Sequence, residues 1–155
     1  MALQAGERAP DVTLPSHEHQ QTPLSSLWTN GPAVLLFVPL AFSSTCTEEL
    51  CAVRDDYASY TGLNATVAAI SVDSPYVQKR FREDVGADYV FLSDFNREAS
   101  RAYHVLRTAP VGPGLLDASE RAVFVIGQDG VIRYAWQGEH PGVLPVFEEI
   151  KAALA

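Results

Sequence analysis

Hydrophobic positions in the first part of the chain form short apolar runs separated by helical patterns. Ala33–Val38 (AVLLFV) and Thr66–Val72 (TVAAISV) have the length and character of strands covered on both faces. Between them, from Ser44 to Tyr60, apolar residues recur at three- and four-residue spacing, which predicts a helix. Tyr89–Leu92 predicts a further short strand. This alternation of strands and helices is typical of α/β proteins.

Three further helices are predicted along the rest of the chain. Ser74 and Pro75 have the character of an N-cap and a first helical residue, so a helix is expected from there to about Val85. A short helix is expected over Glu98–His104, and an amphipathic helix over Gly142–Leu154.

Two hairpins and one long loop complete the pattern. Val12–Leu14 followed by the polar stretch Ser16–Thr22 suggests an N-terminal loop or β-hairpin, and Ala122–Ile126 pairs with Val131–Trp136 across a Gln-Asp-Gly turn. Thr108–Ser119 is rich in proline and glycine and predicts a mobile surface loop. Together these elements predict a thioredoxin-like α/β fold, with a central mixed β-sheet flanked by helices and an N-terminal β-hairpin extension.

Composition and charge argue against a nucleic-acid-binding, membrane or secreted protein. The 155 residues carry 11 Lys and Arg against 19 Asp and Glu, a net charge of −8. This length predicts a single domain over residues 1–155, and so acidic a chain is a poor partner for nucleic acid. No apolar run approaches the roughly 20 residues of a membrane span, and the first residues show no secretory signal pattern. We therefore expect a cytoplasmic protein with neither nucleic-acid nor membrane partners.

The candidate chemistry centres on two cysteines, Cys46 and Cys51. Cys46 follows a predicted strand and turn and opens a predicted helix, whose N–H groups lower the pKa of a thiol and favour the reactive thiolate. A buried, inert cysteine is the alternative. Pro39 would shield the sulfur from water, the Ser43 hydroxyl could accept from the backbone and donate to a bound oxygen, and Glu49 could hold a cation or remain a solvated charge.

The segment Pro39-Leu-Ala-Phe-Ser43-Ser-Thr-Cys46 resembles the active-site motif of the peroxiredoxins, and Ile70–Asp73, Phe91–Asp94 and Arg121–Ile126 resemble further landmarks of that family. The resemblance implies that Cys46 is the peroxidatic cysteine and Ser43 its hydroxyl partner. It also implies that the Arg121 guanidinium lies beside the thiolate. The expected substrates are hydrogen peroxide and organic hydroperoxides, and no metal or other cofactor is expected.

Cys51 lies five residues after Cys46. In one regular helix this spacing separates the Cα atoms by roughly 8.6 Å, beyond disulfide range, so the helix must unwind before the two sulfurs can join. The spacing resembles the peroxiredoxin Q (bacterioferritin comigratory protein) subgroup, in which the second cysteine resolves the sulfenic acid intramolecularly. A thioredoxin-type dithiol would then be the reductant.

Several alternatives stay open on the sequence. Other features resemble the one-cysteine alkyl-hydroperoxidase-E subgroup, in which case Cys51 is a bystander. A thioredoxin-fold redox sensor without turnover is a third hypothesis, and the protein could be a monomer or a homodimer. His104 stands where the family usually carries glycine.

Two further groups of side chains have weaker candidate roles. The His17-Glu-His19 stretch is expected to be a solvated loop, because two histidines without a third ligand make a poor metal site. Phe42, Trp28 and Trp136 could line an apolar rim for organic hydroperoxides, although burial in the core is the default for aromatic residues.

Overall fold

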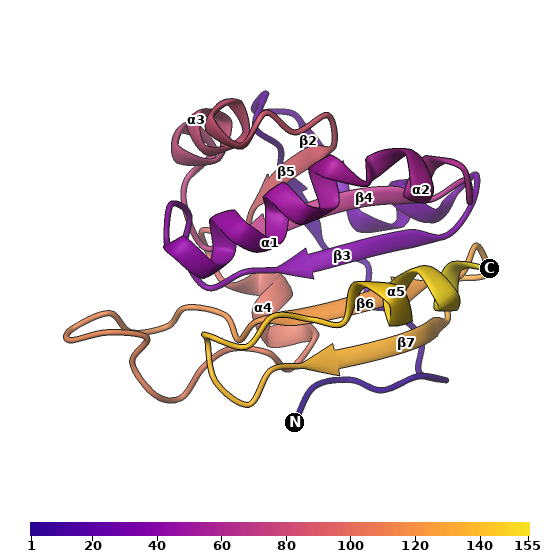
Figure 1. The fold of residues 1–155 in the computed structure, drawn as a ribbon. Coiled ribbons are helices and arrows are strands. Elements are labelled where there is room, and N and C mark those ends of the chain that lie inside the picture. Colours follow the sequence, from indigo (N-terminus) through magenta and orange to yellow (C-terminus); the bar gives the residue numbers. More distant parts are fainter.

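The computed structural model describes all 155 residues, Met1–Ala155, as a central sheet between two layers of helices (Figure 1). The five-stranded sheet has the order β5-β4-β3-β6-β7, in which β3 runs parallel to β4 and antiparallel to β6. Its strands are β3 (Ala33–Phe37), β4 (Thr66–Ser71), β5 (Val90–Ser93), β6 (Ala122–Ile126) and β7 (Ile132–Gln137). A separate hairpin is formed by β1 (Thr13–Pro15) and β2 (Gln21–Pro23). The expected mixed sheet and N-terminal hairpin are therefore confirmed.

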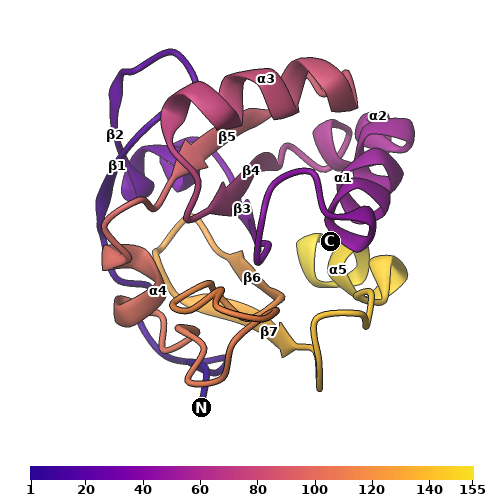
Figure 2. The same ribbon diagram turned by 90° about the vertical axis from the view of Figure 1, so that its left-hand side faces the viewer.

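Helices cover both faces of the sheet, as Figure 2 shows. The helices are η1 (Leu24–Trp28), α1 (Ser44–Asp55), α2 (Tyr57–Thr61), α3 (Pro75–Val85), α4 (Glu98–Ala102) and α5 (Phe147–Leu154). One hydrophobic cluster joins alternate residues of β3 to buried side chains of α1, α3 and α5, and the other joins the remaining β3 residues to η1 and α4. All five residues of β3 are buried, which explains why this strand is a continuous apolar run.

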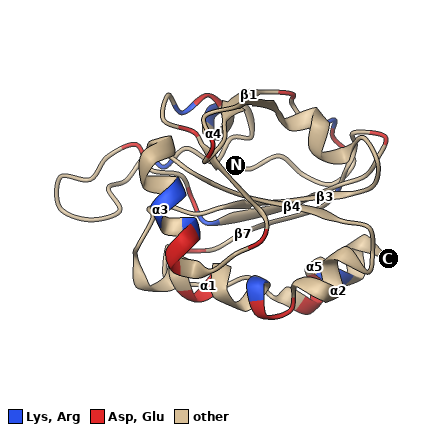
Figure 3. Cartoon of the chain, turned by 90° about the horizontal axis from the view of Figure 1, so that it is seen from above, with Lys and Arg blue, Asp and Glu red and all other residues tan.

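Most charged residues lie on the helices and loops around the sheet (Figure 3). On α3 the basic residues Lys79, Arg80 and Arg82 precede the acidic Glu83 and Asp84, and Arg82 shares the last turn with the two carboxylates. No helix combines the length and the apolar character that a membrane span needs.

Three predicted helices have different limits in the structure, and the shortest of them, α4, ends at Ala102 rather than at His104. The single helix expected over Ser44–Tyr60 is interrupted at Asp56, whose φ of −114° and ψ of 22° leave the helical region. Asp56 instead accepts a hydrogen bond from Lys151 of α5 at 2.6 Å, a tertiary contact that periodicity cannot show. The C-terminal helix begins at Phe147 rather than Gly142, because Pro145 disfavours helical geometry in the residue before it.

The loop expected to be solvated is exposed at Glu18 and His19, but its first residue, His17, is buried. His17 is only 7% exposed, and its backbone N–H donates to the carbonyl of Phe91 in β5. Its Nδ1 atom accepts from the Phe91 N–H at 3.3 Å, so the hairpin loop docks on the edge strand. His104 has a φ of 57°, in the left-handed region that glycine adopts without strain, which accounts for the family's use of glycine there.

The buried His17 predicts a loss of stability at mildly acidic pH. Burial, aided by the charge of Arg82, lowers the pKa of His17 from its ordinary 6.5. The unfolded chain then binds the proton more readily, so stability present above pH 6.5 is lost as the pH falls through the lower folded-state pKa. Urea unfolding at pH 7.5 and 5.5 is expected to show that His17→Asn flattens this dependence.

The effect should be about 0.5–1.5 kcal/mol, the contribution of one buried hydrogen bond. His140→Asn is the matched control, because the exposed Nδ1 of His140 also accepts a backbone N–H, that of Gly142, at 3.2 Å. Equal pH dependence in the wild type and in His17→Asn would show that His17 does not carry the effect.

Candidate active site

Two segments that are distant in the sequence meet at one end of the central strands β3 and β6. The carboxyl end of β3 leads through a short loop into α1, where Cys46 is the third helical residue. Because β6 is antiparallel to β3 and Phe37 pairs with Ala122, the residue before β6, Arg121, lies at the same end. Cys46 and Arg121 are thus neighbours although 75 positions separate them.

The Arg121 guanidinium is held by three acceptors. It donates to the Cys46 sulfur at 3.1 Å, to Glu49 Oε1 at 2.9 Å and to the carbonyl of Pro141 at 2.9 Å. Arg121 is 3% exposed and Cys46 is fully buried. A guanidinium in this position cannot lose its proton and can stabilise negative charge on an atom that it contacts.

Glu49 completes the charged group under the helix. It is fully buried and ion-paired with Arg121, so of the two interpretations the one in which it holds a cation is confirmed and the solvated charge is wrong. Burial raises the pKa of Glu49 to about 7, against the opposing effect of the Arg121 guanidinium. Burial acts to lower the pKa of Arg121, but Cys46 and Glu49 together raise it above its ordinary value. Arg121 therefore stays charged, and the ion pair with Glu49 holds its guanidinium group in place.

A pocket of about 300 Å³ opens above this group. Its walls come from the loop before α1, the first residues of α1 and two later loops: Pro39, Leu40, Ser43, Ser44, Thr45, Val111, Leu115, Arg121, Pro141 and Gly142. The N–H groups of Ser44, Thr45 and Cys46 precede the first hydrogen bond of the helix, which Thr47 donates to the Ser43 carbonyl. A small ligand in the pocket would therefore meet a guanidinium and the positive end of a helix.

Ser43 borders this pocket at the N-cap position of α1. Its hydroxyl donates to the Leu40 carbonyl at 3.0 Å and makes no capping bond, so the expected acceptance from the backbone is not found. The hydroxyl oxygen keeps its lone pairs for a donor in the pocket. Pro39 is buried and lines the pocket.

The aromatic residues considered for an apolar rim do not line the pocket. Trp28 is buried in the core, and Trp136 lies on β7 and borders a different surface hollow. Phe42 is 48% exposed and packs on Phe81 of α3, with ring centroids 4.9 Å apart. The apolar part of the rim is supplied instead by Leu40 and by Val111 and Leu115 of the long loop.

Cys51 lies on the same helix as Cys46. Both are free thiols within Ser44–Asp55, and Cys51 is half-buried. The carbonyl of Leu50, next to Cys51, accepts a hydrogen bond from the buried Tyr89 hydroxyl at 2.6 Å. Burial raises the pKa of Tyr89, so its phenol stays protonated and remains a donor. The helix is thus tied to β5 at the turn that separates the two sulfurs.

One polar residue near the site was not singled out by the sequence. Asp73, just after β4, accepts a hydrogen bond from the backbone N–H of Ala41 at 2.7 Å and thereby holds the loop that leads to Cys46. Its position in the Ile70–Asp73 landmark was the available signal, but landmark order alone does not indicate a contact with that loop.

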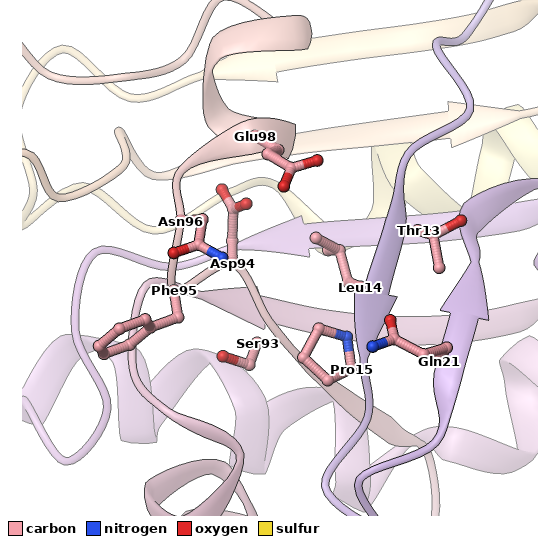
Figure 4. A pocket seen from close by; sticks show the side chains of 9 residues that line it. All are labelled: Thr13, Leu14, Pro15, Gln21, Ser93, Asp94, Phe95, Asn96 and Glu98. Atoms are coloured by element: carbon pink, nitrogen blue, oxygen red, sulfur yellow. The ribbon is translucent and has the colours of Figure 1, made fainter.

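A second pocket, of about 180 Å³, lies between the N-terminal hairpin and the start of α4 (Figure 4). Its buried carboxylate, Asp94, accepts from the N–H groups of Ala99 and Ser100 and from the Ser100 hydroxyl. These bonds cap α4 and use the carboxylate structurally. Neither Cys46 nor Arg121 lines this pocket. Arg121, which contacts the Cys46 sulfur, lines the pocket of about 300 Å³, and that pocket is therefore the candidate active site.

Comparison with known proteins identifies the chemistry. Residues 5–135 match the model of the AhpC/TSA family. The chain is 31% identical over 142 residues to alkyl hydroperoxide reductase E of Mycobacterium bovis, covering 90% of this chain and 88% of that protein. It is 27% identical over 137 residues to peroxiredoxin Bcp of Bacillus subtilis, covering 88% and 87%.

A solved structure agrees in the fold. The crystal structure of peroxidoxin BcpB from Mycobacterium tuberculosis superposes with a TM-score of 0.87 at 29% identity, covering 98% of this chain and 96% of that chain. Relatives named for Bcp and for alkyl hydroperoxide reductase E both occur, in agreement with the mixed resemblance of the motif. The chain belongs to the AhpC/TSA family and is a peroxiredoxin, an enzyme that reduces peroxides with a thiol.

Proposed function

We propose that Cys46 is the attacking sulfur and that Cys51 resolves its oxidised form. The observation that carries the first part is the 3.1 Å contact between Arg121 and the Cys46 sulfur. The Cys46 thiolate attacks one peroxide oxygen, the O–O bond breaks, and the leaving oxygen takes a proton to become water or an alcohol. Cys46 is left as a sulfenic acid, the first step of the oxidation ladder.

The residues around the sulfur supply what this step requires. Negative charge moves from sulfur to the leaving oxygen, and donors fixed in advance along that path stabilise the transition state more than the ground state. Arg121 and the free N–H groups of the first turn of α1 are such donors, and we assign Ser43 as a further polar contact. Glu49 has the role of orienting Arg121 through their 2.9 Å bond.

Resolution requires α1 to unwind. The sulfenic acid of Cys46 condenses with the Cys51 thiol, which releases water and forms a disulfide. Because both residues lie in regular helix, their Cα atoms are roughly 8.6 Å apart and must come closer before the bond can form. The first turns therefore open, which exposes the buried Glu49 and Leu50 for the time of this step.

The rest of the cycle follows from the chemistry of the disulfide. We propose a thioredoxin-type dithiol as the reductant and the cytoplasm as the compartment, where such dithiols are kept reduced. A monomer can carry out the attack and the resolution, because all the groups named for these steps come from one chain.

In the one-cysteine alternative an external thiol reduces the sulfenic acid and Cys51 is a bystander. The similarity to alkyl hydroperoxide reductase E supports this alternative.

Turnover and disulfide mapping test the proposal together. With thioredoxin, its reductase and NADPH, the protein should consume many equivalents of peroxide, whereas a redox sensor stops near one. After a single equivalent of peroxide, intact mass and non-reducing peptide mapping should show the loss of two hydrogens between Cys46 and Cys51. A persistent sulfenic adduct on Cys46 would instead support the one-cysteine alternative.

The hydrogen bond from Tyr89 to Leu50 predicts a specific change in the resolution step. Tyr89→Phe removes a bond that exists only in the wound helix, so disulfide formation should become faster by roughly 2–10-fold, corresponding to about 0.5–1.5 kcal/mol. Rapid-quench mass spectrometry after one equivalent of peroxide measures the rate.

Tyr103→Phe is the matched control for that measurement. The Tyr103 hydroxyl donates to the Pro10 carbonyl at 2.7 Å on the other face of the sheet, away from α1. An equal acceleration in both variants would mean that general loosening, and not the tie on α1, controls the step.

A further inference from the structure

The loop that delivers Cys46 has an unfavourable backbone conformation. Phe42 has a φ of 66°, in the left-handed region, where an aromatic residue is an outlier. Such a conformation persists only where the surrounding structure holds it. Phe42 lies four residues before Cys46 and directly before the N-cap residue Ser43, so its bend sets the direction in which α1 begins.

Asp73, just after β4, makes a side-chain hydrogen bond that holds this bend, in addition to the Ser43–Leu40 bond and the packing of Phe42 on Phe81. Its Oδ2 atom accepts from the Ala41 N–H at 2.7 Å, next to Phe42 in the chain. The same oxygen accepts from the Ser71 hydroxyl at 2.7 Å, and that hydroxyl in turn accepts from the Asp73 N–H. The Asp73 carbonyl accepts from the Ser93 hydroxyl at 2.6 Å. The side chain and the backbone of Asp73 are thus both fixed to the carboxyl ends of the strands β4 and β5.

The charge of Asp73 is not used in an ion pair. None of the salt bridges of the chain includes it, although Glu49 and Glu120 nearby in the fold are each paired with an arginine. Asp73 is half-buried, and the two hydrogen bonds to Oδ2 are the contacts of its carboxylate. A carboxylate fixed in this way acts as a rigid acceptor for a backbone N–H.

We propose that Asp73 is a positioning residue for peroxide reduction. By holding the Ala41 N–H, it keeps the Pro39–Ser43 loop bent, and the bend places Cys46 in the first turn of α1 against Arg121. Displacements of about 1 Å at a reacting atom can cost 10²-fold in rate, so a contact five residues from the sulfur is sufficient to matter. The inference rests on the proposed attack by Cys46.

Three variants of Asp73 and one matched control test the inference. Asp73→Ala removes the acceptor, Asp73→Asn retains an amide oxygen for the Ala41 N–H, and Asp73→Ala/Phe42→Gly replaces the strained residue by one that takes the bend freely. Asp11→Ala is the control, because Asp11 makes the same pair of bonds, to the N–H and hydroxyl of Ser25 at 2.9 and 2.7 Å. Asp11 borders neither Cys46 nor its pocket.

The readouts are the second-order rate with hydrogen peroxide, the rate of alkylation of Cys46 by iodoacetamide in a Cys51→Ser background, and the melting temperature. We expect Asp73→Ala to slow the peroxide reaction by about tenfold or more and alkylation by less than threefold, because alkylation does not need the aligned donors. Asp73→Asn should recover most of the rate, the glycine double variant should be faster than Asp73→Ala, and Asp11→Ala should match the wild type.

Different results would overturn the inference without touching the function. A peroxide rate in Asp73→Ala within twofold of the wild type, or equal losses in Asp73→Ala and Asp11→Ala, shows that the contact does not position Cys46. Parallel losses of the peroxide and alkylation rates show a general loss of structure instead. If Asp73→Ala does not fold, a double variant no faster than one-tenth of the wild type overturns the proposal. A wild-type protein that consumes no peroxide refutes the proposed function itself.

Discussion

Replacing Arg121 by leucine is expected to lower kcat/KM for peroxide by about 10²–10³-fold, the usual cost of removing a fixed donor to a developing negative charge. The guanidinium contacts the Cys46 sulfur and borders the pocket, so it acts on both the nucleophile and the bound peroxide. Steady-state peroxide consumption at several pH values measures the loss. Arg121→Lys should recover only part of the rate, because an ammonium cannot bridge Cys46, Glu49 and Pro141 at once.

The stability of the variant has to be separated from its chemistry. Leucine leaves the buried Glu49 carboxylate without its partner, which costs about 3–5 kcal/mol when one member of a buried pair is removed. Arg121→Leu/Glu49→Gln removes that unpaired charge and should regain stability while the reaction stays slow. Glu49→Gln alone should keep most of the activity, since the amide oxygen of glutamine can still accept the Arg121 N–H that orients the guanidinium. A fast double variant would show that the guanidinium is not a participant in peroxide reduction.

Replacing Cys51 by serine is expected to stop thioredoxin-supported turnover almost completely while leaving the first oxidation within about twofold of the wild-type rate. Serine is nearly isosteric and the site is half-buried, so the fold and the Cys46–Arg121 contact should persist. Without a resolving thiol the sulfenic acid survives long enough to meet a second peroxide, and sulfinic acid should accumulate on Cys46 at a tenth of the peroxide that the wild type tolerates. Intact mass spectrometry measures the added oxygens.

Ala52→Ser is the control for this experiment. Ala52 is also half-buried on α1, next to Cys51, and serine introduces the same hydroxyl without removing a thiol. Equal over-oxidation of the wild type and Cys51→Ser would favour the one-cysteine mechanism. A Cys51→Ser protein that does not react with peroxide at all would reverse the roles proposed for the two cysteines.

Local patterns predict the sheet well because strands buried on both faces must be apolar throughout. Ala33–Phe37 and Ala122–Ile126 are fully buried in the structure, and both were visible as apolar runs. The predictions were wrong where tertiary contacts determine the limit of a helix or the burial of a loop residue. The first long helix is interrupted at Asp56, whose carboxylate accepts a hydrogen bond from Lys151. His17 is buried because the hairpin loop docks on β5. Neither contact leaves a periodic signal in the chain.

The residues of the candidate site likewise fall into those that the sequence could predict and those that depend on tertiary contacts. Cys46 was predictable from its place after a strand and from the surrounding motif, and Arg121 from the family resemblance. Composition and spacing cannot show that Glu49 is fully buried, since a glutamate at that helical position is equally compatible with solvent. The role inferred for Asp73 needed the bond to Ala41, which joins two loops 32 positions apart.

The antiparallel pairing of β3 with β6 also has a consequence for the newly made chain. Cys46 leaves the ribosome long before Arg121, and the guanidinium reaches the sulfur only when Phe37 pairs with Ala122. We therefore expect a nascent polypeptide that ends before β6 to hold a cysteine of ordinary reactivity. The rapid reaction with peroxides would then begin only once synthesis has passed the sixth strand.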